Sequence, residues 1–159
     1  MDNIIFTEAN EEIKEKICVI WEHMKEWRLG LMPEGDGCYV AAALFNGEVV
    51  GFASLGPDEL IPPLNGCINA CIKDIEVEDE FQRKGIGRTL VGMLEDWAKN
   101  YGYRQIWAWS SQKNIEAIYM WYALNYGMCP AVMLGESAVG DPNDRIVGYY
   151  VVKILNTTT

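Results

Sequence analysis

Two glycines separated by a single residue stand where an extended apolar segment gives way to an amphipathic helix. The stretch reads Gln82, Arg83, Lys84, Gly85, Ile86, Gly87, and Arg88 follows it. Backbone N–H groups in the first turn of a helix lack an acceptor within the helix and carry the positive end of its dipole, and glycines allow a bulky anion to come close. The turn is therefore predicted to bind a phosphate or a pyrophosphate.

The residues on either side predict a strand before the turn and a helix after it. Ile72, Ile75 and Val77 belong to the strand-like run. The apolar residues at helical spacing are Ile86, Leu90, Leu94, Trp97 and Tyr101. Two known phosphate loops are excluded, because the chain has no G-x-x-x-x-G-K-[ST] and no third glycine followed by an acidic residue about 20 positions on. A glycine pair before a helix can also be only a tight turn, so the wider context has to decide.

That context resembles the GNAT superfamily of N-acyltransferases. Gln-x-x-Gly-x-Gly after a strand ending at Val77 is similar to the acyl-CoA pyrophosphate loop of that family. The resemblance continues downstream with a strand over residues 104–109 and then a helix. This helix begins at Asn114, has Ala117 three residues on, and ends at Gly127-Met128. The resemblance covers about residues 70–130, and the N-terminal part matches only in the order of its elements.

The resemblance implies acetyl-CoA as the acyl donor and assigns its contacts. Backbone groups of Ile75 and Val77 would bind the pantetheine arm, and residues 82–88 would hold the pyrophosphate. Asn114 would supply an amide contact to the same cofactor. An Asn at this place can equally be a simple helix N-cap.

The general acid is where this sequence departs from the family. The resemblance implies a tyrosine seven residues after the Asn and four before the Gly, and here those counts give Trp121 and Ala123. Neither donates a proton as a phenol does. Tyr122 reaches the expected place if the helix contains a bulge, a device found at functional sites. The other interpretation is that Tyr122 belongs to the core, because this helix is apolar nearly all round.

A base is needed because an alkyl ammonium, with a pKa near about 10, cannot attack a thioester. Asp74 and Glu76 alternate with Ile75 and Val77, so they are predicted on the opposite face of the strand. We select Glu76 as the base, acting directly or through water, with Asp74 or water as alternatives. Glu76 can also be an ordinary solvated strand residue.

The elements predict one α/β (α+β) domain over residues 1–159, with a mixed, mostly antiparallel sheet of six to seven strands and helices on both faces. The expected strands are 4–7, 38–45, 48–55, the run ending at Val77, 104–109, 128–134 and 146–155, with the second and third joined at Asn46-Gly47. A first helix is capped by Asn10 and buries Ile13, Ile17, Ile20, Trp21 and Met24. Loops are expected over 28–37, 56–67 and 135–145. Trp107 and Trp109 are expected in the core, or Trp109 at the wall of an acceptor site.

Composition excludes several classes of function. A net charge of -10 argues against binding a nucleic acid through its phosphates and is compatible with a cationic amine. No secretion signal or stretch of about 18 apolar residues is present, so a cytoplasmic protein without a membrane span is expected. An odd number of cysteines, five, favours reduced thiols, and no metal site is expected with His23 as the only histidine. His23 itself is expected to be a partly exposed helix residue.

The resulting expectation is an N-acetyltransferase that acts on the primary amine of a small molecule, by direct attack within a ternary complex. One alternative is acetylation of a peptide N-terminus or a protein lysine. Another is a binding module that senses acyl-CoA without chemistry, which Trp121 at the tyrosine position favours. A homodimer is compatible with the sequence.

Overall fold

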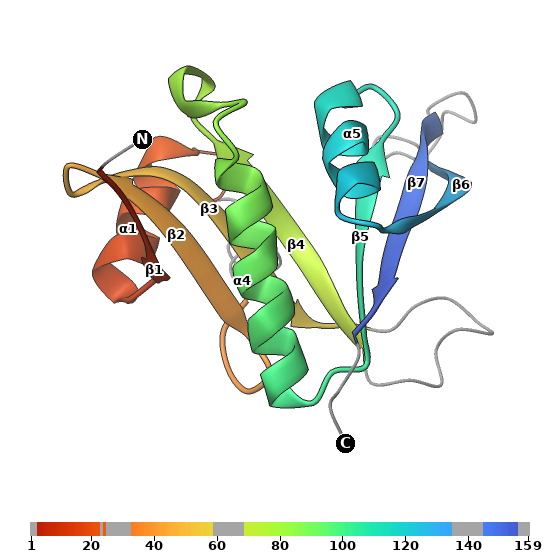
Figure 1. Ribbon diagram of the computed structural model, residues 1–159, viewed down its shortest axis with the longest axis horizontal. Coiled ribbons are helices and arrows are strands. Elements are labelled where there is room, and N and C mark those ends of the chain that lie inside the picture. The colour runs from red at the N-terminus through yellow and green to blue at the C-terminus, as the bar shows by residue number, and fades with distance from the viewer. Residues whose placement is uncertain (1–2, 23, 25–32, 59–68, 135–144, 156–159) are drawn as a thin grey trace. The chain divides into compact units, whose positions relative to one another are not determined.

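The computed structural model describes residues 3–22, 24, 33–58, 69–134 and 145–155. It has a mixed α/β fold with a seven-stranded, mostly antiparallel sheet and, in these ranges, three α-helices (Figure 1). This confirms the predicted fold class. The chain divides into two compact units, Met1–Ile106 with Leu155–Thr159, and Trp107–Ile154.

Four antiparallel strands form the sheet of the first unit. They lie in chain order: β1 (Ile4–Glu8), β2 (Tyr39–Phe45), β3 (Glu48–Pro57) and β4 (Asn69–Val77). The predicted hairpin is confirmed, because Asn46 and Gly47 join β2 to β3 with φ angles of 52° and 86°. Two positive φ values in a two-residue turn match the twist of paired strands.

The end of β3 differs from the prediction. The strand continues through Gly56 and Pro57, which pair with Cys71 and Ala70 of β4. Glycine and proline had indicated a loop, but pairing with a partner strand overrides local preference at a strand end. The remainder of the predicted 56–67 loop, from residue 59, lies outside the described residues, as do Cys67, His23 and most of the other two predicted loops.

Two helices cover opposite faces of these four strands. In Figure 1, α4 (Ile86–Tyr101) crosses the front of the sheet and α1 (Glu11–Ile20) lies behind it. The side chain of Asn10 accepts a hydrogen bond from the Ile13 N–H at 2.9 Å, so the predicted cap is confirmed. Ile17 and Met24 are fully buried in the core on this face. Ile20 is 38% exposed, so its predicted burial is wrong, because α1 ends at that residue.

A buried tyrosine ties the end of α4 to the segment before β2. The Tyr103 hydroxyl donates to the Gly37 carbonyl oxygen at 2.9 Å, and the side chain is 2% exposed. Burial, with a smaller effect of Tyr101, raises the pKa of Tyr103 to about 12. The phenol is therefore kept neutral where it donates this bond.

The second unit contains one helix and the strand order β5-β7-β6. Its elements are β5 (Gln105–Ser111), which begins just before the unit, α5 (Ile115–Ala123), β6 (Gly127–Leu134) and β7 (Arg145–Ile154). β6 and β7 pair antiparallel along their length. Ile115, Tyr119 and Tyr122 are 59%, 72% and 74% exposed, so the prediction that α5 is buried nearly all round is wrong. Hydrophobicity along a helix cannot say which of its sides another element covers.

Candidate active site

The strand β4 contains a bulge before its last few residues. Ser54 of β3 pairs with Asp74, and Leu55 pairs with Ile72, so Lys73 is the extra residue on the β4 side. Its ammonium forms an ion pair with Asp58, with Nζ 2.6 Å from Oδ2. The bulge is thus tied to the residue that follows β3.

Beyond the bulge, the backbone groups of Ile75 and Val77 point away from β3. The Glu78 N–H donates to the Val50 carbonyl oxygen at 3.0 Å. Hydrogen-bonded pairs alternate along an antiparallel ladder, so Glu76 occupies the next bonded pair with β3, and the residues between face the other edge. Ile75 and Val77 therefore present N–H and C=O groups at the edge where the sequence predicts the pantetheine arm.

Two side chains reach these edge groups. The Ile75 N–H donates to Asp74 Oδ1 at 2.9 Å. The Val77 carbonyl oxygen accepts from Gln82 Nε2 at 3.0 Å, and the same nitrogen donates to Asp79 Oδ1 at 2.9 Å. Both hydrogens of this amide nitrogen are thereby engaged, so the Gln82 side chain braces the turn in the structure without a ligand.

The turn after β4 has a backbone suited to an anion. A short 3-10 helix, η2 (Asp79–Phe81), leads into it, and Arg83 and Gly85 have φ angles of 57° and 84°. Residues of positive φ that alternate with residues of negative φ can aim their N–H groups into a concavity that binds anions. The first backbone bond of α4 runs from the Thr89 N–H to the Gly85 carbonyl oxygen at 3.0 Å, so the N–H groups of residues 86–88 precede the helical ladder.

The N-terminus of α4 differs from those of the other two described α-helices. Asn10 and Asn114 cap α1 and α5 with their side chains, and acidic residues occupy both first turns. Gly85 provides no side-chain cap to α4, whose first turn has no acidic residue and carries Arg88. The positive end of this helix dipole is left for an anion.

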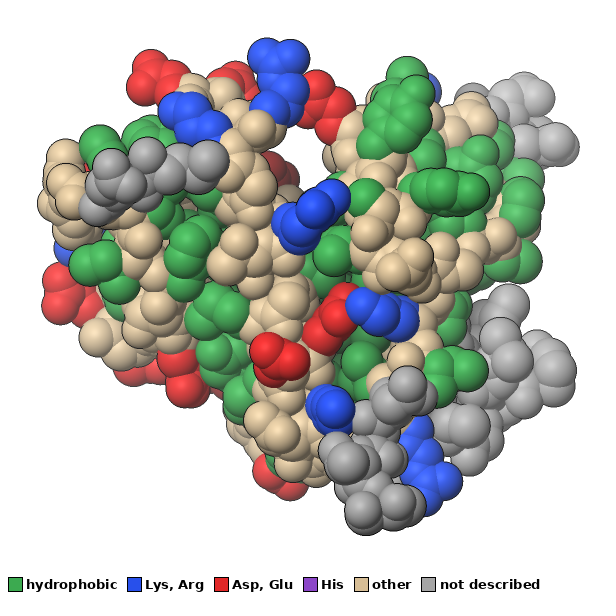
Figure 2. All heavy atoms as spheres, viewed as in Figure 1, with side chains coloured by type: hydrophobic (Ala, Val, Ile, Leu, Met, Phe, Trp, Pro, Cys, Tyr) green, Lys and Arg blue, Asp and Glu red, His purple; other side chains and the backbone are tan. Residues whose placement is uncertain are grey.

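Basic side chains surround the same turn. Figure 2 shows Lys and Arg side chains gathered there, with Asp and Glu side chains beside them. The Lys84 ammonium lies 4.9 Å from the centroid of the Phe81 ring, which packs against Phe45 with ring centroids 5.2 Å apart. This cation–π contact holds a positive charge close to the predicted pyrophosphate site.

Asp74 and Glu76 lie on the face of the sheet that α1 covers, opposite to Ile75 and Val77. Asp74 pairs with the fully buried Ser54, and Glu76 pairs with Phe52, whose ring packs on Trp21 of the α1 side with centroids 5.1 Å apart. The register confirms the predicted alternation along the strand. Both carboxylates are partly buried.

Asn114 and Tyr122 belong to the second unit. The Asn114 side chain accepts a hydrogen bond from the Ala117 N–H at 3.1 Å, which confirms the N-cap and leaves its Nδ2 donors for the predicted cofactor contact. The helix is regular from Ile115 to Ala123, so the bulge that would bring Tyr122 into the family's register is not present in it. The core interpretation of Tyr122 is also wrong, since its side chain is 74% exposed.

The two family counts lead to Trp121 and to Ala123, so the interval from Asn114 to Gly127 is two residues longer than the family's spacing. These two extra residues are accommodated at the C-terminal end of α5. The Tyr126 N–H donates to the Trp121 carbonyl oxygen at 3.0 Å, and Asn125 has a φ of 61°. A left-handed residue with a bond of this span is a common helix stop. Trp121 is 3% exposed, so the residue at the expected tyrosine position is a core residue.

The paired tryptophans of β5 pack within the second unit. Trp107 and Trp109 both contact the ring of Tyr150, with centroids 5.8 Å and 5.2 Å away. A Cβ on Gly148 would lie 2.8 Å from Trp109 Cζ2, so the indole ring lies over this glycine. Both side chains are only partly buried, whereas Ile106 and Ala108 are buried, so the prediction that the tryptophans lie in the core is wrong, and they pack on Tyr150 at its margin.

Two of the thiols near β4 are poor nucleophiles. Burial raises the pKa of Cys71 to about 12, with Lys73 acting in the opposite direction. Burial also raises the pKa of Cys38. Since the thiolate is the reactive form, neither cysteine is prepared to carry an acyl group near neutral pH. Among the described residues, no group of three or more His, Cys, Asp or Glu side chains could hold a metal ion.

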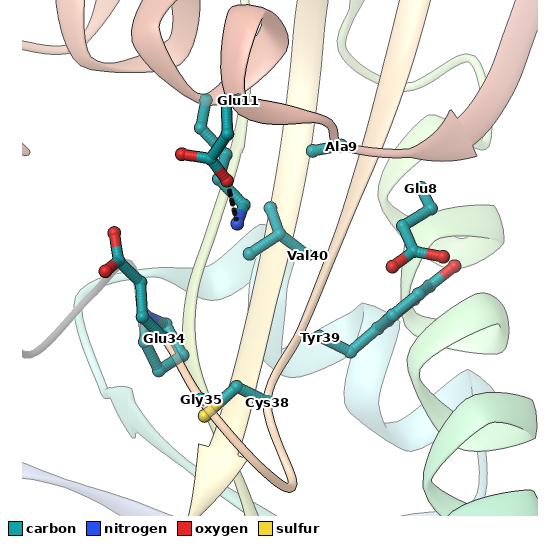
Figure 3. Close-up of a pocket in the computed structure, with 10 residues that line it drawn as sticks. Glu8, Ala9, Glu11, Glu34, Gly35, Cys38, Tyr39 and Val40 are labelled. Carbon is teal, nitrogen blue, oxygen red and sulfur yellow. Dashed lines mark hydrogen bonds and ion pairs between the residues drawn. The ribbon is translucent and has the colours of Figure 1, made fainter.

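A polar pocket of about 330 Å³ lies at the other end of the first unit's strands (Figure 3). It is lined by Glu8, Glu11 and Glu34 and includes Tyr39, with the Glu8 carboxylate near the hydroxyl end of that ring. Tyr39 pairs with Leu55 of β3, whereas the end of β4 pairs with the start of β3. The pocket is therefore separate from the Gly-rich turn, and its residues come from segments that sequence spacing could not bring together.

No described helix is both long and apolar enough to span a bilayer. This result concerns only the residues that the structure describes.

Comparisons with known proteins found a matching family model and solved structures with a similar fold. A model of the acetyltransferase (GNAT) family matches residues 5–126. The fold is similar to that of the ribosomal-protein-S18-alanine N-acetyltransferase from Escherichia coli, with 15% identity, a TM-score of 0.73, and coverage of 98% of this chain and 96% of that one. No curated protein matches the sequence.

Two further solved structures share the fold. A GNAT family acetyltransferase from Elizabethkingia anophelis with acetyl-CoA bound has 18% identity and a TM-score of 0.71, over 98% of this chain and 100% of that one. An N-acetyltransferase from Staphylococcus aureus Mu50 has 20% identity and a TM-score of 0.73, over 98% and 100%. At these identities the likeness shows the fold alone.

Proposed function

Because the chain belongs to the acetyltransferase (GNAT) family, we propose that it transfers the acetyl group of acetyl-CoA to the primary amine of a small molecule, by direct attack within a ternary complex. The observation that carries the proposal is the N-terminus of α4. It combines orphan amides, a left-handed Gly85 cap without a side chain, and basic neighbours. We further propose that residues 1–159 act as one cytoplasmic domain.

Acetyl-CoA is the acyl donor, and the first unit supplies most of its contacts. The pyrophosphate binds to the amides of residues 86–88, with Arg83, Lys84 and Arg88 neutralising its charge. The pantetheine arm runs along the edge of β4 and uses backbone groups of Ile75 and Val77. In the second unit, the Nδ2 group of Asn114 donates to the cofactor.

The reaction needs a base, an oxyanion donor and an acid. Glu76 takes a proton from the ammonium directly or through water, and the amine nitrogen then attacks the thioester carbonyl carbon. A backbone N–H of β4 stabilises the oxyanion that forms. The intermediate collapses as the C–S bond breaks, and the nitrogen loses its second proton to water. The exposed phenol of Tyr122, which lies on a regular helix outside the family's register, protonates the departing thiolate, with water as the alternative acid. Asp74 and water are the alternative bases.

The low reactivity of the two thiols described above favours direct attack by the amine over an acyl-cysteine intermediate. Cys38 and Cys71 both have raised pKa values and stay protonated near neutral pH. The acceptor amine is consistent with the net charge of -10, which raises the local concentration of cations.

A second candidate acceptor is a peptide N-terminus or a protein lysine. The observation in its favour is the similarity to an enzyme named for the alanine of a ribosomal protein. A third candidate, a non-catalytic acyl-CoA sensor, is favoured by the buried Trp121 at the position of the family's tyrosine.

One assay separates the three candidates. Release of CoA thiol from acetyl-CoA is measured with a panel of small amines and with peptides bearing a free N-terminus or a lysine. Turnover with a small amine and none with peptides is expected. Turnover only with peptides would move the assignment to the second candidate, and binding of acetyl-CoA without thiol release from any acceptor would move it to the third.

A further inference from the structure

The backbone N–H of Ile75 already has an acceptor on its own strand. Asp74 Oδ1 accepts this hydrogen at 2.9 Å, in a partly buried position. The register of β3 and β4 directs the same N–H toward the edge away from β3. The proposed function places the acyl donor at this edge, and the present inference rests on that proposal.

A single N–H cannot serve two acceptors equally well. A carbonyl group of acetyl-CoA would have to approach the same hydrogen atom that already bonds to the Asp74 carboxylate. The carboxylate is the stronger acceptor, because hydrogen bonds to a charged group are shorter and stronger than those to a neutral carbonyl. Donor binding at Ile75 therefore requires this contact to break.

The surroundings hold Asp74 where it makes the contact. The preceding residue, Lys73, is the bulge residue and is fastened to Asp58 by the 2.6 Å ion pair. The facing residue on β3, Ser54, is fully buried. The backbone that positions the carboxylate is thus fixed on both sides, so the bond to Ile75 is a property of the fold at the bulge.

We propose that Asp74 competes with the acyl donor for the Ile75 N–H and thereby sets the affinity for acetyl-CoA. In the free protein the carboxylate holds the amide. It moves away when the donor binds, and it returns when CoA leaves, which favours product release. Asp74 is in this sense a positioning residue that acts through the Ile75 amide.

The test compares two substitutions that both remove the charge. Asp74→Asn keeps an oxygen that accepts from Ile75, whereas Asp74→Ala removes the acceptor. Affinity for acetyl-CoA is measured by calorimetry, so that any effect on turnover does not enter. We expect Asp74→Ala to bind about 3- to 10-fold more tightly than Asp74→Asn, the range of one net hydrogen bond. Equal affinities, or weaker binding by Asp74→Ala, would overturn the inference.

A second measurement observes the amide directly. In protein labelled with nitrogen-15, the Ile75 amide resonance without ligand is expected to be similar in wild type and Asp74→Asn, and to move in Asp74→Ala. An Ile75 resonance unchanged in Asp74→Ala would show that the bond is absent and would overturn the inference. If Asp74→Ala does not fold, Asp74→Glu replaces it, because the longer side chain retains the charge but moves the carboxylate away from the Ile75 N–H. Asp74→Glu should then bind acetyl-CoA more tightly than the wild type, and equal affinity of the two would overturn the inference.

Failure of the proposed function gives a different outcome. Wild-type protein that does not bind acetyl-CoA would remove the proposed donor site and with it the competition, even where the amide resonance still reports the bond to Asp74. Wild-type binding combined with equal Asp74→Ala and Asp74→Asn affinities would contradict the competition and leave the donor site in place.

Discussion

Replacing Gly87 with Val tests whether the first turn of α4 holds the pyrophosphate. Gly87 is the second residue of the helix, and its amide is one of the three that precede the bond from Thr89 to Gly85. A valine side chain adds three carbon atoms next to the backbone that a phosphate must approach. The free protein should still fold, because Val is less costly than Gly within a helix.

The size of the expected effect follows from ligand binding to the native state. Acetyl-CoA at about 100 times its Kd stabilises the folded protein by about 2.7 kcal/mol. For a chain of this length, about 1 kcal/mol changes the Tm by about 2–4 °C, so the wild type should gain about 5–11 °C. A tenfold weaker site would still give about 1.4 kcal/mol at the same concentration. Complete loss of the shift therefore requires a much larger loss of affinity.

Gly92→Val is the matched control. Gly92 lies in the same helix, and a Cβ added there meets nothing within 4 Å. Thermal unfolding of both variants, with and without acetyl-CoA, should show the shift in Gly92→Val and none in Gly87→Val. A folded Gly87→Val protein that keeps the wild-type shift would refute the pyrophosphate assignment.

Three further predictions concern the base, the acid and a buried phenol. Glu76→Gln should lower kcat by roughly 10²- to 10⁴-fold and move the ascending limb of the kcat pH profile toward the amine's own pKa, while the affinity for acetyl-CoA and the activity of the control Glu78→Gln stay unchanged. If Glu76→Gln keeps both the wild-type kcat and the wild-type pH profile, Asp74 or water is the base. Tyr122→Phe should lower kcat by roughly 10- to 10³-fold, and it should not lower stability because the side chain is exposed. The control Tyr119→Phe, at a similarly exposed position, should keep the wild-type kcat; equal activity of Tyr122→Phe and wild type would point to water as the acid. Tyr103→Phe should cost about 1–3 kcal/mol in denaturant unfolding at pH 8, because it leaves a carbonyl without its donor. The folded-state pKa of about 12 lies above the ordinary value of 10.0, so the stability linked to this proton is present below pH 10 and is lost as the pH rises toward 12; the wild type should lose more stability over that window than the variant, and equal losses would contradict the assignment.

Local sequence signals were sufficient for much of the fold and for the place of the Gly-rich turn between β4 and α4. The Asn46-Gly47 turn, the Asn10 and Asn114 caps and the helix after Gly85 depend on φ preferences and on side chains that reach only three residues along the chain. The alternation of Glu76 with its neighbours follows from the geometry of an extended strand. Such features appear in the sequence because the interactions that produce them are short-range.

Where the sequence failed, the deciding interaction came from another part of the chain. Tyr122 was expected either in a bulge or in the core, and it is in neither, because the surplus residues are accommodated after Ala123 and the other side of the helix is the buried one. The strand β3 runs through Gly56 and Pro57 because β4 is there to pair with them. Apolar side chains on every face of α5 carry no information about which face is covered.

The sequence by itself determined the order of elements, the Gly-rich turn and the strand that precedes it, because periodicity and backbone preference are properties of neighbouring residues. Only the tertiary structure decided which hydrogen-bond partners the backbone groups at the edge of that strand have. Lys73 becomes a bulge residue through its register with β3 and its ion pair with Asp58, and Asp74 is then placed against the Ile75 amide. Register and side-chain contacts depend on which strands pair and which groups they exclude from water, so no spacing along the chain could have specified them.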